Sequence, residues 1–85
     1  MRLFFTKSFE RDYKKLPTKI QKQLDKQLTF LLTNSKYPSL RIKKMEGYFD
    51  ILEGRISKNY RFTFQIKKEA YYIHRAGTHK ILNNP

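Results

Sequence analysis

The spacing of hydrophobic positions at the start of the chain predicts a strand and then a helix. An unbroken apolar run predicts a short strand over Arg2–Phe5. From Lys7 the apolar residues recur four and then three positions apart, which places them on one helix face, at Phe9, Tyr13 and Leu16. Thr6 or Ser8 is available to cap this helix, and Pro17 breaks it.

A second, longer helix is predicted directly after this break. Thr18, three residues before Gln21, has the form of a capping box, which marks a helix start. An apolar stripe then runs to about Thr33, at Ile20, Leu24, Leu28, Leu31 and Leu32. Such a stripe indicates a helix that packs on a sheet. The polar segment Asn34–Ser39 follows as a turn.

The second half of the chain predicts three strands. They span Tyr48–Ser57, Tyr60–Lys67 and Ala70–Ala76, and the intervals between them are short enough for hairpins, so an antiparallel meander is expected. The basic segment Leu40–Met45 before them is expected to be a loop or an irregular strand. After them the chain is expected to leave the sheet at Gly77 and make one helical turn.

This order of elements predicts a single α+β domain over residues 1–85. A strand, two helices and a meander give an antiparallel sheet with both helices on one face, the other face open, and a short C-terminal tail. Strict alternation in Tyr60–Lys67 points the apolar residues one way and Arg61, Thr63 and Gln65 the other. Arg61 is therefore expected on the face without helices.

The net charge of the chain indicates what kind of partner it binds. Nineteen Lys and Arg against seven Asp and Glu leave a formal net charge of +12, which favours nucleic acid or an acidic protein as the target. No apolar run approaches the roughly 20 residues of a membrane span, and the N-terminus is too short and polar for a secretory signal. We therefore expect a cytoplasmic protein with no membrane partner. Without cysteine it has no disulfide.

Two strand arginines and a histidine suggest metal-free RNA cleavage. That reaction needs a base for the 2′-hydroxyl proton, an acid for the leaving 5′-oxygen, and cations for the phosphorane. Arg55 and Arg61 lie six apart across a tight turn, so they are expected close together, where their planar forks suit phosphate. Solvated strand arginines are the ordinary alternative. His79, at the end of the last strand, is the candidate acid or base, whereas His74 is equally suited to packing.

The densest basic patch is Arg41, Lys43 and Lys44, which suits the phosphate backbone of a nucleic acid. A lysine there with a lowered pKa is a candidate base, and solubilising charge is the plainer explanation. The stripe Lys19, Lys22 and Lys26 lies opposite the apolar helix face and is expected to be solvated. The patterns of NTPases, zinc proteases and two-metal nucleases are missing, so no metal or cofactor is expected.

Several short stretches together resemble the RelE/ParE toxin superfamily. Their order and spacing carry the resemblance over nearly the whole chain, and they are Phe5–Pro17, Lys43–Gly47, Glu53–Ser57, Tyr60–Phe62 and Gly77–His79. The resemblance implies a strand–helix–helix–meander fold and the toxin role in a type II toxin–antitoxin system. It also implies ribosome-dependent cleavage of mRNA in the RelE-like and YafQ-like branches, which inhibits translation. The expected partners are mRNA on the ribosome and an acidic antitoxin wound around the toxin.

The resemblance also implies roles for individual residues. Arg55 and Arg61 match strand arginines that hold the scissile phosphate, and His79 matches a Gly-Ser/Thr-His position that serves as acid or base. Arg75 matches another recurring basic position, and Lys43 with Lys44 falls where RelE-like toxins carry functional lysines. The mid-chain histidines of YafQ-like toxins are missing, so the general base is unassigned. The alternatives are a ParE-like inhibitor of DNA gyrase, which shares the fold without the catalytic set, and a non-enzymatic nucleic-acid-binding module.

Overall fold

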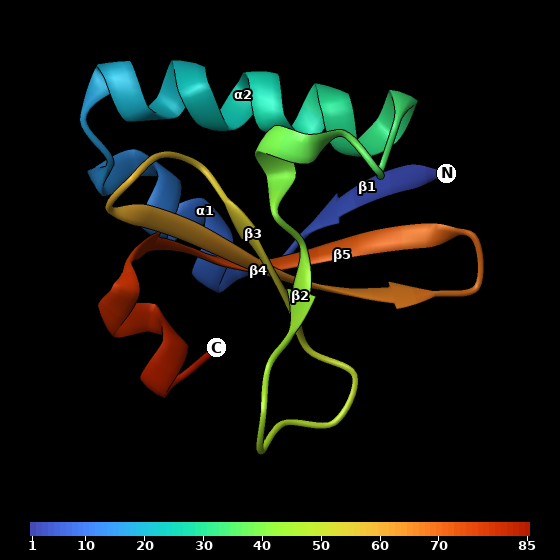
Figure 1. Cartoon of the computed structure of the whole chain (residues 1–85). Coiled ribbons are helices and arrows are strands. Elements are labelled where there is room, and N and C mark those ends of the chain that lie inside the picture. The colour runs from blue at the N-terminus through green and yellow to red at the C-terminus, as the bar shows by residue number, and fades with distance from the viewer.

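A five-stranded sheet runs through the middle of the molecule, with the long helix Thr18–Thr33 above it, the shorter helix Lys7–Lys15 at its left and the C-terminal turn below it (Figure 1). The computed structural model describes residues 1–85. The strands lie in the order β1-β5-β4-β3-β2. Their bounds are β1 Arg2–Phe5, β2 Lys43–Lys44, β3 Leu52–Arg55, β4 Tyr60–Lys67 and β5 Ala70–Thr78.

The two predicted helices are confirmed as α1, Lys7–Lys15, and α2, Thr18–Thr33. Thr6 caps α1, since its Oγ1 accepts a hydrogen bond from the Phe9 amide at 3.1 Å. The capping box predicted for α2 is wrong, because Pro17 occupies the cap position and no side chain bonds there. Neither helix combines the length and apolar character that crossing a membrane requires.

The sheet is mixed, which corrects the prediction of a wholly antiparallel one. The meander β3-β4-β5 is antiparallel as predicted, but β1 lies parallel to β5, from Arg2 opposite Ala70 to Phe5 opposite Ile73. Parallel neighbours require a long crossover between them, and here that crossover contains both helices and the rest of the sheet. The irregular segment before the meander supplies the short strand β2 at the opposite edge.

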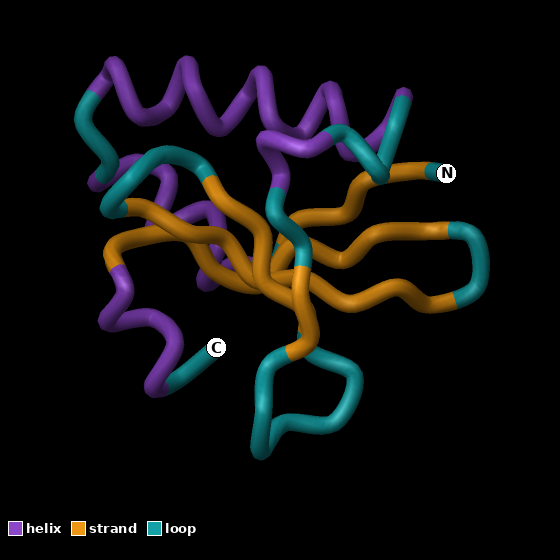
Figure 2. The backbone as a smooth tube through the Cα atoms, in the orientation of Figure 1, coloured by secondary structure: helices purple, strands orange, loops and turns teal.

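The predicted limits of two strands are wrong. Only Leu52–Arg55 of the segment predicted to start at Tyr48 is strand, because Gly47 and Asp50 have φ of 83° and 60° and turn the chain away (Figure 2). At the other end β5 continues beyond Ala76 to Thr78. Gly77 does not leave the sheet, since it pairs with Arg61 across the β4–β5 ladder.

An irregularity in β5 decides which of its residues face the core. Thr63 pairs with Arg75 but Phe64 pairs with Ile73, so His74 is an extra residue on that strand, as in a β-bulge. The core lies between this face and the helices, and its members are Phe9, Leu16, Leu24, Leu28, Leu31, Leu40, Ile56, Phe62, Phe64, Tyr71, Ile73 and Ala76. Because of the bulge, Ile73 and Ala76 both face the core although they are three positions apart. Arg75 and Gly77 lie on the other face.

Two single-turn 3-10 helices complete the fold. The first, η1, spans Pro38–Leu40, where Leu40 is fully buried beneath α2. The second, η2, spans His79–Asn83 and confirms the helical turn predicted for the tail. It lies on the side of the sheet away from the helices (Figure 2), so the face expected to be open is partly covered at the end of β5.

Candidate functional site

Arg55 and Arg61 are direct neighbours across the β3–β4 hairpin, as predicted. Residues opposite each other in an antiparallel pair point to the same face, which here is the one away from the helices. The pKa of the Arg61 guanidinium is lowered, first by burial and then by the positive charges of Arg55 and Arg41. Cations are thus held together on this face more closely than free solvation would favour.

The β3–β4 turn fixes the Arg61 side chain. Its Nη1 donates to three backbone carbonyls, those of Ser57 at 2.6 Å, Tyr60 at 2.9 Å and Lys58 at 3.1 Å. Nε and Nη2 have no protein acceptor. Half of the guanidinium fork is therefore anchored, and the other half is available to an anionic ligand.

Five of the residues predicted for the site line one cavity of about 360 Å³. They are Arg41, Lys43, Arg55, Arg61 and His79, and Glu53 and Leu82 complete the lining. The cations come from the segment after η1, from β2, β3 and β4, and the histidine from the start of η2. Segments nearly forty residues apart in the sequence therefore meet here, over the hairpin at the left of Figure 1.

Glu53 is the site residue that the sequence reasoning missed. It is only 7% exposed, it lies opposite both Lys43 and Thr63 in the ladder, and its Oε1 is 3.4 Å from Lys43 Nζ. The proton acceptors in this cavity are the Glu53 carboxylate and the neutral form of His79, because charged Lys and Arg side chains must lose a proton before they can accept one. Its position two residues before Arg55 on one strand places both on the same face, and this parity was the available signal.

A close approach at Gly77 allows η2 to bring His79 over the sheet. A Cβ at Gly77 would lie 2.9 Å from Cγ2 of Ile81, a contact that real Cβ atoms do not make. Without that Cβ, Ile81 packs down onto the sheet and is buried. His79, the first residue of the turn, is exposed and lines the cavity beside the arginines.

The other two predicted basic residues lie outside this cavity. Lys44 pairs with Leu52, so it points to the opposite face from Lys43 and lines an apolar groove near Phe49. Arg75 is held by α1, since its Nε and Nη2 donate to Asp12 Oδ2 and Oδ1 at 2.6 and 3.3 Å.

Arg75 instead ties the tail in place. Its Nη1 donates to the Asn84 carbonyl at 2.9 Å, and the hydrogen bond to Asp12 raises its pKa. Asp12 also accepts from the Ala76 amide at 3.0 Å, at the part of the β5 edge that β1 does not cover. The arrangement anchors β5 to α1 and ties the C-terminal end of η2 to β5.

His74 lies away from the cavity. Its Nε2 is 2.7 Å from Gln65 Oε1 on β4, and burial, followed by the charge of Lys67, lowers its pKa. This matches the expectation that it is suited to packing.

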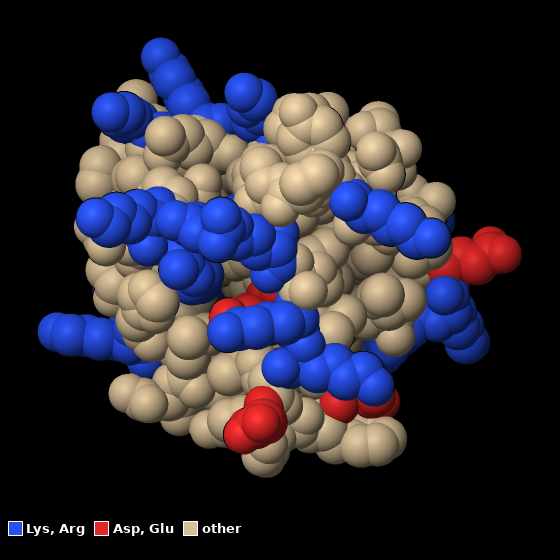
Figure 3. Space-filling view, viewed as in Figure 1, with Lys and Arg blue, Asp and Glu red and all other residues tan.

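The face of the molecule around the cavity is strongly basic. In the space-filling view Lys and Arg side chains form a band over the β3–β4 hairpin and continue down over β2, with few acidic side chains between them (Figure 3). A potential of this sign attracts polyanions.

Solved structures similar to this chain include a toxin and toxin–antitoxin complexes. A chain of the RelB-RelE antitoxin-toxin complex from Methanococcus jannaschii matches with a TM-score of 0.73 at 24% identity over 95% of each chain. The E. coli DinJ-YafQ complex matches at 0.78 and 14%, over 94% of this chain and 93% of that one. The YoeB/ParE toxin from Agrobacterium tumefaciens matches at 0.79 and 14%, over 93% and 99%. No family model and no curated relative matches the sequence. The chain has the RelE-like fold of these toxins.

Proposed function

We propose that this protein is the toxin of a type II toxin–antitoxin pair, a metal-independent endoribonuclease that cleaves mRNA on the ribosome. The observation that carries the proposal is the cavity in which Arg55, Arg61 and His79 meet beside Glu53. This cavity brings together two guanidinium groups suited to clamping a phosphate and two side chains able to transfer a proton. The resemblance to RelE-like and YafQ-like toxins adds the ribosome to this proposal.

The proposed chemistry uses each of these groups once. The scissile phosphate binds between Arg55 and Arg61, which stabilise the charge on the phosphorane. The Glu53 carboxylate takes the proton of the 2′-hydroxyl as its oxygen attacks phosphorus. The bond from phosphorus to the 5′-oxygen breaks, and protonated His79 donates a proton to that oxygen. The products are a 2′,3′-cyclic phosphate and a free 5′-hydroxyl.

The proposal includes an acidic antitoxin as partner. A net charge of +12 and a cationic cavity on an open face leave the free protein self-repelling, and an acidic chain would relieve that repulsion. RelE and YafQ in the similar structures are complexed with antitoxins. A small neighbouring gene that encodes an acidic segment and neutralises the toxicity is the expected genetic signature.

Expression of the wild type and of His79→Ala tests the proposal. The wild type should arrest growth and leave mRNA 3′ ends that map to codons, while His79→Ala should do neither. Equal toxicity of both, with intact mRNA, would refute ribonuclease activity. Inhibition of supercoiling by the purified protein would then identify a gyrase inhibitor, and growth without arrest would identify a non-enzymatic binding module.

A further inference from the structure

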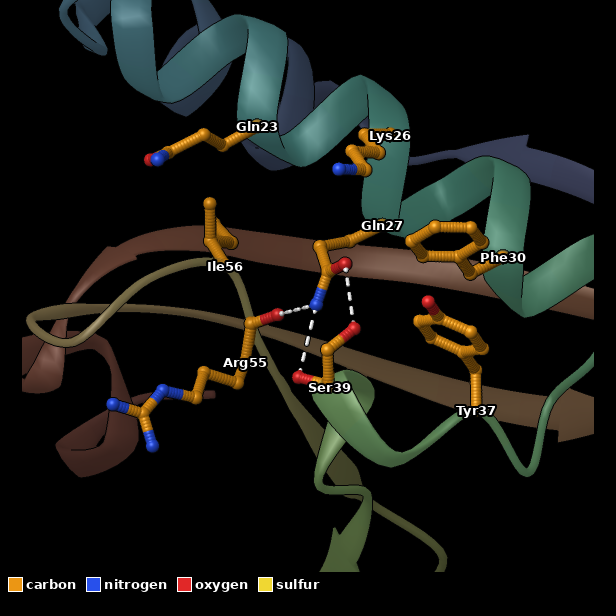
Figure 4. Close-up of a pocket in the computed structure, with 8 residues that line it drawn as sticks. All are labelled: Gln23, Lys26, Gln27, Phe30, Tyr37, Ser39, Arg55 and Ile56. Atoms are coloured by element: carbon orange, nitrogen blue, oxygen red, sulfur yellow. Dashed lines mark hydrogen bonds between the residues drawn. The ribbon is translucent and has the colours of Figure 1, made fainter.

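A second cavity, of about 300 Å³, lies next to the first, between α2, η1 and the end of β3 (Figure 4). Arg55 lines both cavities. Figure 4 shows its guanidinium pointing away from α2, while its carbonyl faces α2. A ligand in the second cavity is therefore separated from a phosphate in the first by one residue.

Gln27 gives the second cavity a fixed wall. It is 5% exposed, and its Nε2 donates to the carbonyls of Arg55 at 2.7 Å and Ser39 at 3.0 Å. Its Oε1 accepts from the Ser39 hydroxyl at 3.2 Å. Both amide hydrogens and the oxygen of Gln27 are used in these bonds, which connect α2 with η1 and β3. Gln27 therefore has no free group for a ligand, and a ligand must contact the other residues of the lining.

The remaining lining combines an aromatic face, a cation and an unpaired polar atom. The rings of Phe30 and Tyr37 stack with centroids 4.0 Å apart, and Tyr37 is 39% exposed. Lys26 Nζ lies 5.7 Å from the Phe30 centroid. Gln23 Oε1 is shielded from solvent and accepts no hydrogen bond, which is costly unless a ligand supplies a donor.

We propose that this second cavity binds a base of the RNA strand whose scissile phosphate lies in the first; the proposal rests on the ribonuclease function. A base has the flat face that stacks on Tyr37. Gln23 lies at the opposite end of the cavity (Figure 4), where its free oxygen is available to a donor elsewhere on the same strand. Lys26 lies beside the strand that leads into the cavity. Because Arg55 is shared, the base and the phosphate belong to neighbouring nucleotides.

A protein segment is a poorer occupant of this cavity. The groove between α1 and α2 is far more apolar, with Phe5, Phe9, Tyr13 and Leu28 in its lining, and it lies away from Arg55. The second cavity has a lysine and two glutamines in its lining and adjoins the phosphate site. Its chemistry thus continues that of the cationic face.

The chain offers a closely matched control for the aromatic stack. Tyr72 on β5 stacks on Phe4 with centroids 5.1 Å apart, and Lys67 Nζ lies 5.8 Å from its ring. It repeats the combination of tyrosine, phenylalanine and lysine at the other edge of the sheet, away from the cavities. Tyr72→Ala and Tyr37→Ala therefore remove the same chemistry from two places.

The experiment measures binding of six-nucleotide single-stranded RNAs of each base to the His79→Ala protein, which retains the binding surface. Tyr37→Ala should weaken binding about tenfold, as loss of one base stack does, while Tyr37→Phe and Tyr72→Ala should stay within about twofold. Thermal melts establish that each variant is folded.

Equal affinities for Tyr37→Ala and Tyr72→Ala would overturn the subsite, as would a Tyr37→Ala effect confined to binding of an antitoxin. The two proposals fail separately. If RNA binding depends on Tyr37 but the protein with His79 intact never cuts RNA, the proposed function fails and Tyr37 marks a base site of an RNA-binding protein. If cleavage requires His79 while Tyr37→Ala changes neither RNA affinity nor the distribution of cut sites, the subsite alone fails.

Discussion

Arg75 shares one face of the sheet with the pair Arg55 and Arg61, and only Arg75 is neutralised by a carboxylate. Arg75 forms two hydrogen bonds to the Asp12 carboxylate, which raises its pKa. Arg61 lies beside Arg55, and burial together with that neighbouring charge lowers its pKa. Arg75 therefore stabilises the fold, whereas the charge of Arg61 beside Arg55 destabilises it.

The difference between the paired and the unpaired arginines distinguishes a structural contact from a ligand-binding site. Gathering like charges without counterions costs stability, so a folded protein is expected to carry such a cluster where a ligand completes it. The cavity around Arg61 contains four Lys and Arg side chains and one carboxylate. An anionic ligand supplies the charge that the protein does not, and substitutions at Arg61, Glu53 and Asp12 test this contrast.

Arg61→Ala should have the largest effect. Loss of a phosphate-stabilising guanidinium should lower kcat/KM for RNA cleavage by roughly 10²- to 10³-fold. Its bonds to the hairpin turn are lost, but so is the repulsion from Arg55, so the free energy of unfolding should change by less than about 1 kcal/mol. Cleavage kinetics and urea denaturation on the same preparation measure both. If Arg61→Ala were inactive because it is largely unfolded, Arg61 would have a structural role like that of Arg75.

Glu53→Gln should separate binding from catalysis. Without the negative charge the cavity holds phosphate more tightly, so RNA affinity should rise severalfold. Cleavage should fall by about 10²-fold, because the amide cannot accept the 2′-hydroxyl proton. RNA binding and single-turnover cleavage, each measured for Glu53→Gln and wild type, give the two numbers. Weaker binding with unchanged cleavage would show that Glu53 only positions Lys43.

Asp12→Ala should act on stability. It leaves Arg75 unpaired and the Ala76 amide without its acceptor, which should lower the free energy of unfolding by about 2 kcal/mol. Urea denaturation measures this, with the exposed Asp25→Ala as control, since that carboxylate accepts only the Tyr13 hydroxyl at 2.8 Å. A stability loss no larger than that of the control would show that Asp12 is not a structural anchor.

A smaller effect concerns the pH dependence of stability through His74. Its pKa in the folded protein is below its ordinary value of 6.5, so the unfolded chain binds the proton more tightly. The stability due to neutral His74 is therefore complete above pH 6.5 and declines as the pH falls below it. His74→Gln should reduce the difference in unfolding free energy between pH 7.5 and pH 5.5. An identical difference in both proteins would show that other groups cause it.

Local pattern was enough to predict much of this molecule. Hydrophobic spacing gave both helices and the meander, because each element buries one face. The short turn between β3 and β4, together with strand parity, placed Arg55 beside Arg61 on the face away from the helices. His79 followed from its position at the end of the last strand, although β5 ends later than expected.

Features that depend on partners far along the chain were not predictable in this way. The parallel pairing of β1 with β5 joins residues nearly seventy positions apart, and the Asp12–Arg75 pair spans 63. The choice between Lys43 and Lys44 depends on the register of β2 against β3. Glu53 was missed because the sequence shows that it shares a face with Arg55 but not that it is buried between Lys43 and Thr63.

The chemical ends of mRNA cut in a reconstituted translation reaction test the central claim most directly. With the wild type, the account predicts upstream fragments that end in a 2′,3′-cyclic phosphate and downstream fragments with a free 5′-hydroxyl, at positions set by the ribosome. His79→Ala should lower their yield at least about 100-fold. Intact mRNA with the wild type, or fragments with 5′-phosphate ends, would contradict it.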